Sequence, residues 1–533
     1  MSSSRKRPLQ LLAWALLLVP TLAFSLAPLA ILFSNALVQS AGIGRVAADI
    51  SWEIIGRTLL FCVGSAGSAT VVGVLAACLL GTSPFTGRKF LRLLLVLPLL
   101  IPPYLHAIGW TNFLRAGGLP VRAFSTALNL PVTSLATAVY SLPGAIFVLC
   151  LALFPIPCLF AEKALTLVSP TLVEAASVCG ASPWQTWRYA LWPFVRPAAI
   201  SSGMIVFLLA GAELGVPTLL KVRVFNFEVL TQLSAFGDTR SAVMLSAPMV
   251  VVGLLVIFSE FQFVRAERQE ATDLGSEGLS RKTVSARVLS LAAVGTLLLI
   301  SFLLPLGSLV ITAMDWNAFT QMSALALRPI HNSLICTTTA TFVAMVVSLL
   351  LSLTLLRTGP SSRRATDGLL IVGFAVPGTI VALGLLAATG KLSFAALIPP
   401  SLLVIGGLLG RFQIVAFRGV SHTVLQIPRE LFEAAAVEGA GFWQVIRYVI
   451  LPIIRTPASI VCTVVFTLAF NEISSTILLY PPGGETLPIA LYSIEANAPR
   501  AYVASLAVIT LLVLVTALFL ILSFVRTPLR RNS

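Results

Sequence analysis

Charged residues are scarce in this sequence. Asp, Glu, Lys and Arg together make up 10% of the 533 residues, whereas hydrophobic residues make up 57%. Soluble globular proteins carry about 25% charged residues, because a domain folded in water needs a polar surface. The shortage of charge therefore excludes a soluble globular protein. It predicts an all-α integral membrane protein that has the lipid bilayer as its immediate partner.

Residues that bind metals are also few. The three histidines, His106, His331 and His422, lie far apart in the sequence, and the seven cysteines include no CxxC pair. Structural zinc sites and disulfide frameworks need clustered ligands or suitably spaced cysteines. We therefore expect no metal site, no cofactor and no disulfide. Clustered catalytic polar residues are missing as well, so we expect no catalytic residues and no enzyme.

A nucleotide-binding loop is also missing. The segment nearest to the pattern G-x-x-x-x-G-K-[ST] is Gly384–Leu392 (GLLAATGKL), which has five residues between its glycines and a leucine after the lysine. A phosphate-binding loop follows a strand, whereas this segment ends an apolar run. Any ATP hydrolysis would therefore need a separate subunit. The net charge of +15 comes from basic residues near the ends of apolar runs, which indicates membrane topology and no nucleic-acid partner.

Long apolar runs are what the sequence has in abundance. A membrane-spanning helix needs about 20 apolar residues. The sequence predicts twelve such spans: Leu11–Phe33, Thr58–Leu80, Leu93–Leu114, Leu135–Leu159, Pro197–Leu214, Ser241–Phe263, Val288–Met314, Ser333–Leu356, Gly368–Ala388, Ala395–Phe417, Pro457–Leu478 and Tyr502–Val525. The first run follows Arg5-Lys6-Arg7 and could be a cleavable signal peptide. Because the run is longer than the roughly 7 to 15 residues of such a signal, we favour an uncleaved helix.

Basic residues set the orientation of these spans. Most of the 35 Lys and Arg residues fall on one side if the N-terminus is cytoplasmic, and twelve spans then return the C-terminus to the same side. We expect a multi-pass protein of the bacterial inner membrane with both termini in the cytoplasm. The predicted divisions are a tail, first helix and outer loop (1–53), a first transmembrane domain (54–263), a cytoplasmic linker (264–287), a seventh helix and outer loop (288–328), a second transmembrane domain (329–526) and a cytoplasmic tail (527–533).

One stretch of the sequence occurs twice. Residues 174–193 read EAASVCGASPWQTWRYALWP and residues 433–452 read EAAAVEGAGFWQVIRYVILP, which agree at eleven of twenty places without a gap. Ile55–Thr58 likewise aligns with Ile330–Ser333, and Pro102 and Gly109 align with Pro377 and Gly384, all 275 positions apart. Two copies that each contain six spans predict two parallel six-helix repeats.

Each copy of this stretch lies in a long gap between spans, on the predicted cytoplasmic side. Its composition predicts a short helix, a glycine corner at Gly180 or Gly439, and a second helix capped by Ser182-Pro183 or by Gly441. Large aromatic residues follow the corner. Such residues can anchor a protein partner, although they can also lie at the lipid headgroups as an ordinary aromatic belt. The aromatic residues are Trp184, Trp187 and Tyr189 in the first copy, and Phe442, Trp443 and Tyr448 in the second.

The repeated stretch resembles the signature loop of binding-protein-dependent ABC importer permeases, which have the type I permease fold. The resemblance implies two copies of a cytoplasmic ATP-binding subunit, each engaged by one loop acting as a coupling helix, and an extracytoplasmic solute-binding protein. Cys179 in the first loop stands where the second has Glu438, so we expect two unequal docking surfaces. The positions carried over are Glu174, Ala175, Ala176, Gly180 and Trp184 in the first loop, and Glu433, Ala434, Ala435, Gly439 and Trp443 in the second.

Two acidic residues lie near the predicted outer ends of equivalent spans. Glu213 and Glu472 are 259 positions apart, as are the two signature loops. Charges inside membrane spans are rare and often line a pathway, and a pair of carboxylates favours cations. The alternative is structural: each carboxylate pairs with a basic residue such as Lys221, or accepts from backbone freed by Gly211, Gly215 or Pro217. Both readings remain open at this stage.

Prolines interrupt two equivalent spans. Pro102 in the third span and Pro377 in the ninth remove helix hydrogen bonds at matching positions, which kinks a helix and can make it a hinge. An irregularity of packing without motion would produce the same pattern. We record both prolines as candidate hinges.

The cargo is the least determined feature. The fused twin layout and the segment Phe227–Phe236 (FEVLTQLSAF) resemble the iron(III)-type permeases, and carboxylates suit a cationic cargo. Thiamine, polyamine, phosphonate and molybdate or sulfate permeases share the signature loop, so these cargoes remain alternatives. A secondary transporter driven by an ion gradient is the alternative from another class. It would need charged relays along several helices, of which few are present.

Overall fold

The fold is built from α-helices. A computed structural model describes residues 14, 17–19, 21–31, 34, 52–81, 88–115, 126, 131–267, 284–358, 360–390 and 399–526, and this part of the chain contains no strand. Most of the linker 264–287, the tail 527–533 and the start of the predicted division 1–53 lie outside these residues. The all-α expectation is confirmed.

The helices fall into two sets with the same order. The first set is α3 (Trp52–Gly81), α4 (Arg88–Leu100), α5 (Pro103–Phe113), α7 (Val132–Ala138), α8 (Leu142–Leu153), α9 (Pro155–Leu165), α12 (Trp192–Ala212), α13 (Gly215–Leu219), α14 (Phe225–Ser234) and α15 (Thr239–Glu267). The second set is α16 (Val284–Leu298), the π-helical turn η2 (Leu299–Leu303), α17 (Leu304–Thr312), α18 (Trp316–Thr358), α19 (Pro360–Ala375), α20 (Gly378–Thr389), α21 (Pro400–Leu425), α24 (Leu451–Phe470), α25 (Thr476–Leu479), α26 (Leu487–Glu495) and α27 (Arg500–Arg526).

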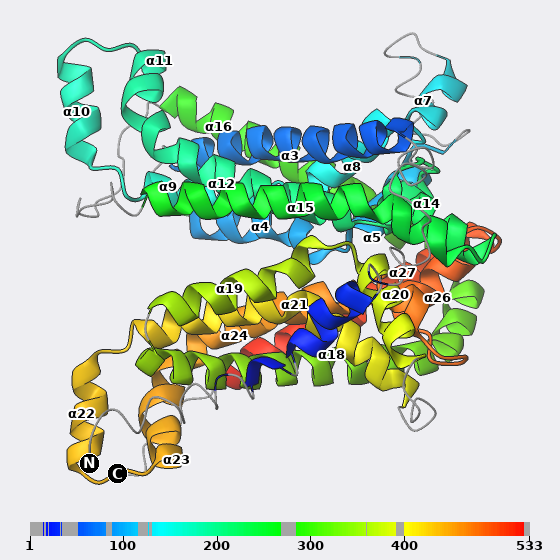
Figure 1. Cartoon of the computed structure of the whole chain (residues 1–533). Helices are drawn as coiled ribbons and strands as arrows, with labels where there is room; N and C mark the ends of the chain where they lie inside the picture. Colours follow the sequence, from blue (N-terminus) through cyan, green and yellow to red (C-terminus); the bar gives the residue numbers. More distant parts are fainter. Residues whose placement is uncertain are drawn as a thin grey trace.

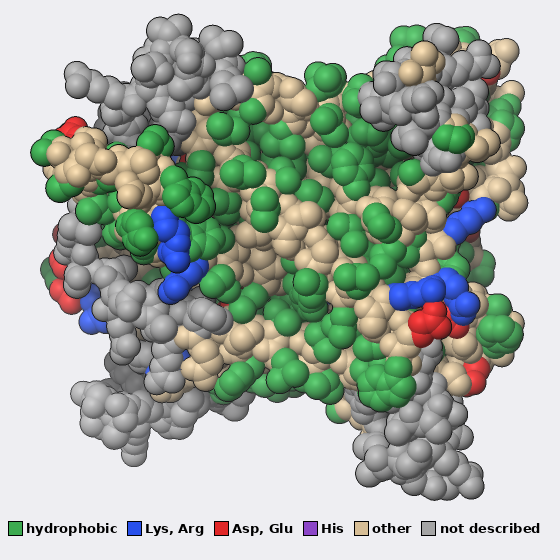
Figure 2. All heavy atoms as spheres, turned by 90° about the horizontal axis from the view of Figure 1, so that it is seen from above, with side chains coloured by type: hydrophobic (Ala, Val, Ile, Leu, Met, Phe, Trp, Pro, Cys, Tyr) green, Lys and Arg blue, Asp and Glu red, His purple; other side chains and the backbone are tan. Residues whose placement is uncertain are grey.

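Eight of the described helices are long and apolar enough to cross a membrane. The number rises to eleven if each of three bent helix pairs counts as one span. The first predicted span is represented by a shorter apolar helix, Thr21–Ile31, and its ends lie outside the described residues. The twelfth span therefore stays a prediction. Figure 2 shows the result on one face, where apolar side chains occupy the middle and charged ones gather toward the two ends.

Two helices extend beyond the spans that were predicted within them. Helix α18 begins at Trp316, well before the predicted start at Ser333, because Asp315 accepts hydrogen bonds from the amides of Asn317 and Ala318 and caps a new helix there. The span predicted to start at Pro197 begins at Pro183, because a π-helical turn joins the loop helix to α12 without interruption. Periodicity alone did not reveal either continuation.

Equivalent hydroxyl groups support the repeat in three dimensions. Thr58 Oγ1 accepts a hydrogen bond from the amide of Phe225 at 2.9 Å, at the start of α14. Ser333, its aligned counterpart, accepts one from the amide of Leu487 at 2.7 Å, at the start of α26. The alignment at 275 positions therefore pairs residues with the same structural role.

The first helix of each half packs against the opposite half. A β-carbon on Gly384 in α20 would lie 2.6 Å from the carbonyl oxygen of Pro28, and one on Gly109 in α5 would lie 2.7 Å from that of Pro305 in α17. Ser308 of α17 also donates to the carbonyl oxygen of Gly109 at 2.7 Å. Figure 1 shows the same exchange, with the dark blue N-terminal helix among α18, α19 and α21, and α16 beside α3. Each half is thus held partly by the other.

Candidate functional site: two matching loops and the seam between the halves

The first repeated loop consists of two short helices around a glycine. Helix α10 (Pro170–Val178) is followed by a corner at Gly180, whose φ of +74° is a left-handed conformation that favours glycine. The corner is closed by a hydrogen bond from the amide of Ala181 to the carbonyl of Ala176, at 3.0 Å, and by one from Cys179 to Ala175, also at 3.0 Å. The alanines of the signature therefore supply the carbonyls that close the turn.

A capped second helix follows the corner. Ser182 and Gln185 form a reciprocal capping box at the start of α11 (Pro183–Gln185), which continues as the π-helical turn η1 (Thr186–Leu191) into α12. The predicted cap at Ser182-Pro183 is confirmed. The loop is therefore joined by continuous helix to the apolar helix α12.

The second loop reproduces this geometry. Helix α22 (Arg429–Val437) is followed by a corner at Gly439, which has a φ of +72°. The amide of Ala440 donates to the carbonyl of Ala435 at 2.9 Å. Gly441 begins α23 (Phe442–Val445), where its amide donates to Gln444 Oε1 at 2.7 Å. The π-helical turn η4 (Ile446–Ile450) then leads into α24. Two segments 259 positions apart thus fold in the same way.

Aromatic side chains are uncovered on both loops. Trp184 is 68% exposed and Trp443 is 74% exposed, and Tyr189 and Tyr448 are exposed to a similar extent. Glu174 and Glu433 are exposed as well. Trp187 differs from the expectation for it, because it is half-buried and packs on Trp192 with ring centroids 5.9 Å apart. Of the first loop's aromatic residues, Trp184 and Tyr189 are the ones available for contact.

Both loops project from the same end of the molecule. In Figure 1, α10 and α11 form one corner of the left edge and α22 and α23 form the other. Two parallel repeats produce this arrangement, whereas inverted repeats would place the loops at opposite ends. The two surfaces are therefore positioned to meet partners on one side of the membrane.

Glu213 and Glu472, predicted near the outer ends of equivalent spans, lie just beyond the ends of equivalent helices. Helix α12 ends at Ala212 and helix α24 ends at Phe470. Glu213 Oε1 accepts the amide of Val216 at 3.2 Å, and Glu472 Oε1 accepts the amide of Ser475 at 2.8 Å. Among the described residues no ion pair joins Glu213 to Lys221. Each carboxylate thus holds a sharp turn after its helix, as the structural alternative described.

Sequence reasoning missed the partner of Glu472. Arg411 lies inside α21, is 2% exposed and forms a salt bridge with Glu472. The positions are 61 apart, so no local pattern connects them. A buried arginine in an apolar helix was the available signal, because such a charge requires a partner.

The two predicted hinge prolines stand at complete breaks between helices. Pro102 separates α4 from α5, which meet at 90°, and Pro377 separates α19 from α20, which meet at 100°. Both prolines have extended backbone, with φ and ψ of −50° and 137° for Pro102 and −53° and 139° for Pro377. The expected kinks are therefore sharp turns of the chain, while motion about them stays a prediction.

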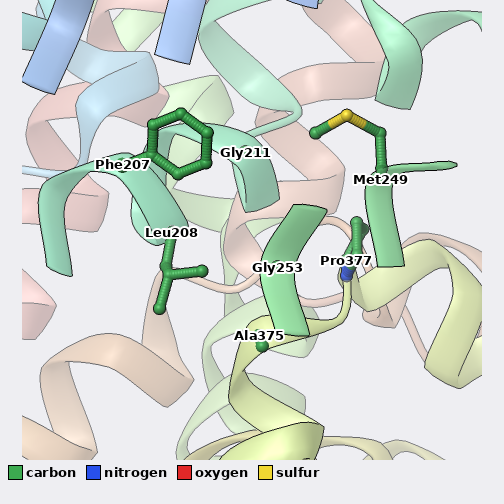
Figure 3. A pocket seen from close by; sticks show the side chains of 7 residues that line it. All are labelled: Phe207, Leu208, Gly211, Met249, Gly253, Ala375 and Pro377. Atoms are coloured by element: carbon green, nitrogen blue, oxygen red, sulfur yellow. The ribbon is translucent and has the colours of Figure 1, made fainter. Parts of the chain in front are cut away.

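A small apolar pocket lies beside one of these breaks. It is a shallow space between α12, α15 and the α19–α20 break. Figure 3 shows its lining: Phe207, Leu208, Gly211, Met249, Gly253, Ala375 and Pro377. The first five residues come from the first half and the last two from the second, so the pocket marks the seam between the halves.

An ionic cluster also joins the halves. Arg418 of α21 forms a two-pronged contact with Asp367 of α19, at 2.8 and 2.9 Å, and also reaches Glu260 of α15 at 3.0 Å. Within the first half, Arg92 of α4 pairs with Glu162 of α9 at 2.8 Å. Arg92 and Asp367 are 275 positions apart, so the sign of the charge is exchanged between the repeats.

Comparison with known proteins accounts for the loops. Residues 350–528 match the family described as "Binding-protein-dependent transport system inner membrane component". That range includes the second loop and most of the second half. Similarity to known permeases also extends over both halves. Residues 350–528 therefore belong to this permease family, and the chain as a whole is similar to known permeases.

Three relatives illustrate the range of the family. The Fe(3+)-transport system permease protein FbpB 2 of Haemophilus influenzae is 23% identical over 465 residues, which cover 84% of this permease and 85% of the relative. The probable ABC transporter permease protein y4fN of Sinorhizobium fredii is 25% identical over 575 aligned positions, covering 98% and 97%. The putative 2-aminoethylphosphonate transport system permease protein PhnV of Salmonella paratyphi A is 25% identical over 250 residues, covering 44% and 92%.

The family match and the similar permeases together indicate the general role. The protein is a multi-pass inner-membrane subunit of an ABC importer with the type I fold, and it is not an enzyme, since separate subunits hydrolyse ATP. Its system includes ATP-binding and substrate-binding partners. The expectation of an ABC permease is therefore confirmed, and the secondary-transporter alternative is not supported.

Proposed function

We propose that this permease carries ferric iron into the cytoplasm, delivered by an extracytoplasmic binding protein and driven by two copies of an ATP-binding subunit. The observation that supports the motor arrangement is the pair of matching loops, each with an exposed tryptophan, at one end of the fold. One subunit would dock on each loop. Trp184 and Trp443 would enter its surface, with Glu174 and Glu433 on the adjoining helices.

Coupling follows from how the loops are connected. Each loop continues through a π-helical turn into a membrane helix, α12 or α24. Helix α12 ends next to Glu213, and helix α24 ends two residues before Glu472. Closure of the ATP-binding dimer would draw both loops together and open the seam outward, and ATP hydrolysis would reset it. The predicted hinges at Pro102 and Pro377 would absorb the change in angle.

This arrangement implies an orientation. The loops and both termini would face the cytoplasm, in agreement with the distribution of basic residues. The opposite end, where α14 and α26 lie, would receive the binding protein. The cytoplasmic tail 527–533 and the linker 264–287 would then lie on the same side as the ATP-binding subunits.

The iron assignment rests on the relatives and on charge. Relatives that cover most of this permease are named as ferric transport permeases. The seam also contains the Glu213 carboxylate, which forms no ion pair among the described residues, and carboxylates favour cations. A relative matching 44% of the chain is named for 2-aminoethylphosphonate, which makes a phosphonate the second candidate cargo.

The motor arrangement can be tested by capturing the ATP-binding subunit with purified permease in nanodiscs. We expect W184A and W443A each to weaken capture by at least about ten-fold, because a buried tryptophan anchor contributes 2 kcal/mol or more to an interface. W316A is the matched control, since Trp316 is 73% exposed but begins helix α18, outside both loops. Undiminished capture by W184A and W443A would refute docking at the loops.

The cargo is checked by measuring binding of ferric ion and of 2-aminoethylphosphonate to the associated binding protein.

A further inference from the structure

The turns at Glu213 and Glu472 are alike in backbone but differ in charge. In both, the carboxylate accepts the amide of the third residue after it. Glu472 also pairs with Arg411, whereas position 152, which lies 259 positions before Arg411, is a buried alanine. Within the described residues, no ion pair involves Glu213. The repeat therefore supplies two carboxylates and one cation.

These groups form one cluster at the seam. Ser474, two residues after Glu472, donates to the carbonyl of Ala212 at 2.8 Å and so ties the second turn to the first. A β-carbon on Gly215 would lie 3.1 Å from Glu213 Oε1 and 3.4 Å from Ile473 Cδ1.

The break between α19 and α20 at Pro377 lies directly against the Arg411–Glu472 ion pair. A β-carbon on Gly378 would lie 2.7 Å from Glu472 Oε1, 2.8 Å from Arg411 Nη1 and 2.9 Å from the amide of Ser475. Only glycine leaves room for the charged groups at that point. Arg411 and Glu472 are therefore held in place from three directions: by α21, by the turn after α24 and by the start of α20.

The charges do not balance. With both carboxylates ionised, one guanidinium leaves a single net negative charge, and Glu472 is 8% exposed and already paired. Glu213 is half-buried and has one backbone donor from Val216. In a poorly solvated seam an unbalanced charge attracts a cation and repels an anion strongly, because Coulomb energies rise as the dielectric constant falls.

We propose that Arg411 neutralises Glu472 and leaves Glu213 as the carboxylate that determines specificity. The seam then accepts cationic cargo and disfavours oxyanions. This inference rests on the proposed function, because it assigns the cargo charge of that same transport pathway. It also makes the two repeat-equivalent glutamates functionally unequal. Removing Glu213 abolishes the net charge, whereas removing Arg411 and Glu472 together preserves it.

The test uses the complete transporter in proteoliposomes, with its binding protein and ATP-binding subunits, and radioactive ferric ion as the probe. We expect E213Q to reduce uptake by at least about ten-fold, equivalent to the loss of one favourable charge interaction. We expect the double variant R411Q/E472Q to stay within about three-fold of the wild type, because a buried ion pair can often be replaced without loss. E213D keeps the charge and is expected to retain more uptake than E213Q.

Two results would overturn the inference. Wild-type uptake by E213Q would show that the carboxylate only caps the turn. A loss in R411Q/E472Q or in E213D as large as that in E213Q would show that geometry, and not net charge, matters. Capture of the ATP-binding subunit by each variant verifies folding. If the wild-type permease itself fails to capture that subunit, the proposed function fails instead, which is a distinguishable outcome.

Discussion

Gly180 and Gly439 are constrained by backbone conformation and not by space. No atom lies within 4 Å of a β-carbon built on either residue, yet both have φ above +70°. Side chains other than glycine pay roughly 1–2 kcal/mol in this left-handed region. The signature glycine is therefore needed to aim the exposed aromatic residues that follow the corner.

Replacing Gly439 with alanine tests this at the residue scale. We expect G439A to leave the membrane domain folded but to cut the ATP hydrolysis stimulated by loaded binding protein several-fold, because the corner is distorted by roughly 1–2 kcal/mol. G441A is the matched control two residues away. Gly441 has a φ of −71°, and the atom nearest to a β-carbon built on it, Gln444 Oε1, is 3.6 Å away. Equal activity of the two variants would contradict the role given to the left-handed corner.

At the scale of elements, the exchanged first helices depend on close approach to glycines. Helix Thr21–Ile31 lies on α20 and α21 of the second half, and α17 lies on α5 of the first. At each site the backbone of a proline, Pro28 or Pro305, would meet any β-carbon on the facing glycine. Backbone cannot move aside as a flexible side chain can, so these contacts fix the separation of the helices.

A methyl group at Gly384 should therefore disturb this contact. We expect G384A to lower the stability of the purified permease by roughly 1–3 kcal/mol, the usual cost of overpacking. G295A on α16 is the control, because no atom lies within 4 Å of a β-carbon there. Thermal unfolding followed by tryptophan fluorescence in detergent compares the two. A melting temperature for G384A equal to that of G295A would argue against the packing of the first helix on α20.

At the scale of the whole molecule, polar contacts join the halves at several places among the described residues. Arg418 bridges α19 and α21 of the second half to Glu260 at the end of α15, and Ser474 reaches Ala212. Apolar contacts and the small pocket between α12, α15 and α19 make up the seam nearby.

The Arg418 cluster should hold the halves together in this conformation. We expect R418Q to raise the ATP hydrolysis rate of the complex without binding protein by about two- to five-fold. The variant leaves two acidic groups facing each other, a cost of about 1–3 kcal/mol after allowance for the exposure of Arg418. R92Q is the control, since it removes the Arg92–Glu162 pair, which lies within one half. If R92Q has the same effect as R418Q, the cluster has no special part in joining the halves.

The sequence by itself determined the features that depend on neighbouring residues. The glycine corners, the Ser182 cap and most of the apolar spans follow from patterns a few residues long, and the duplicated loop followed from comparing the chain with itself. Local geometry is set by local sterics and hydrogen bonding, so such patterns are readable. The ABC permease resemblance came from the same loops.

Only the tertiary structure decided which distant residues meet. Arg411 and Glu472 pair across 61 positions, Pro28 packs on Gly384, and the prolines at 102 and 377 turn the chain by about a right angle instead of kinking it. In an apolar sequence almost any helix face can pack against another, so hydrophobicity does not select the partners. Close contacts at glycines, and the need of a buried charge for its counter-ion, select them in three dimensions.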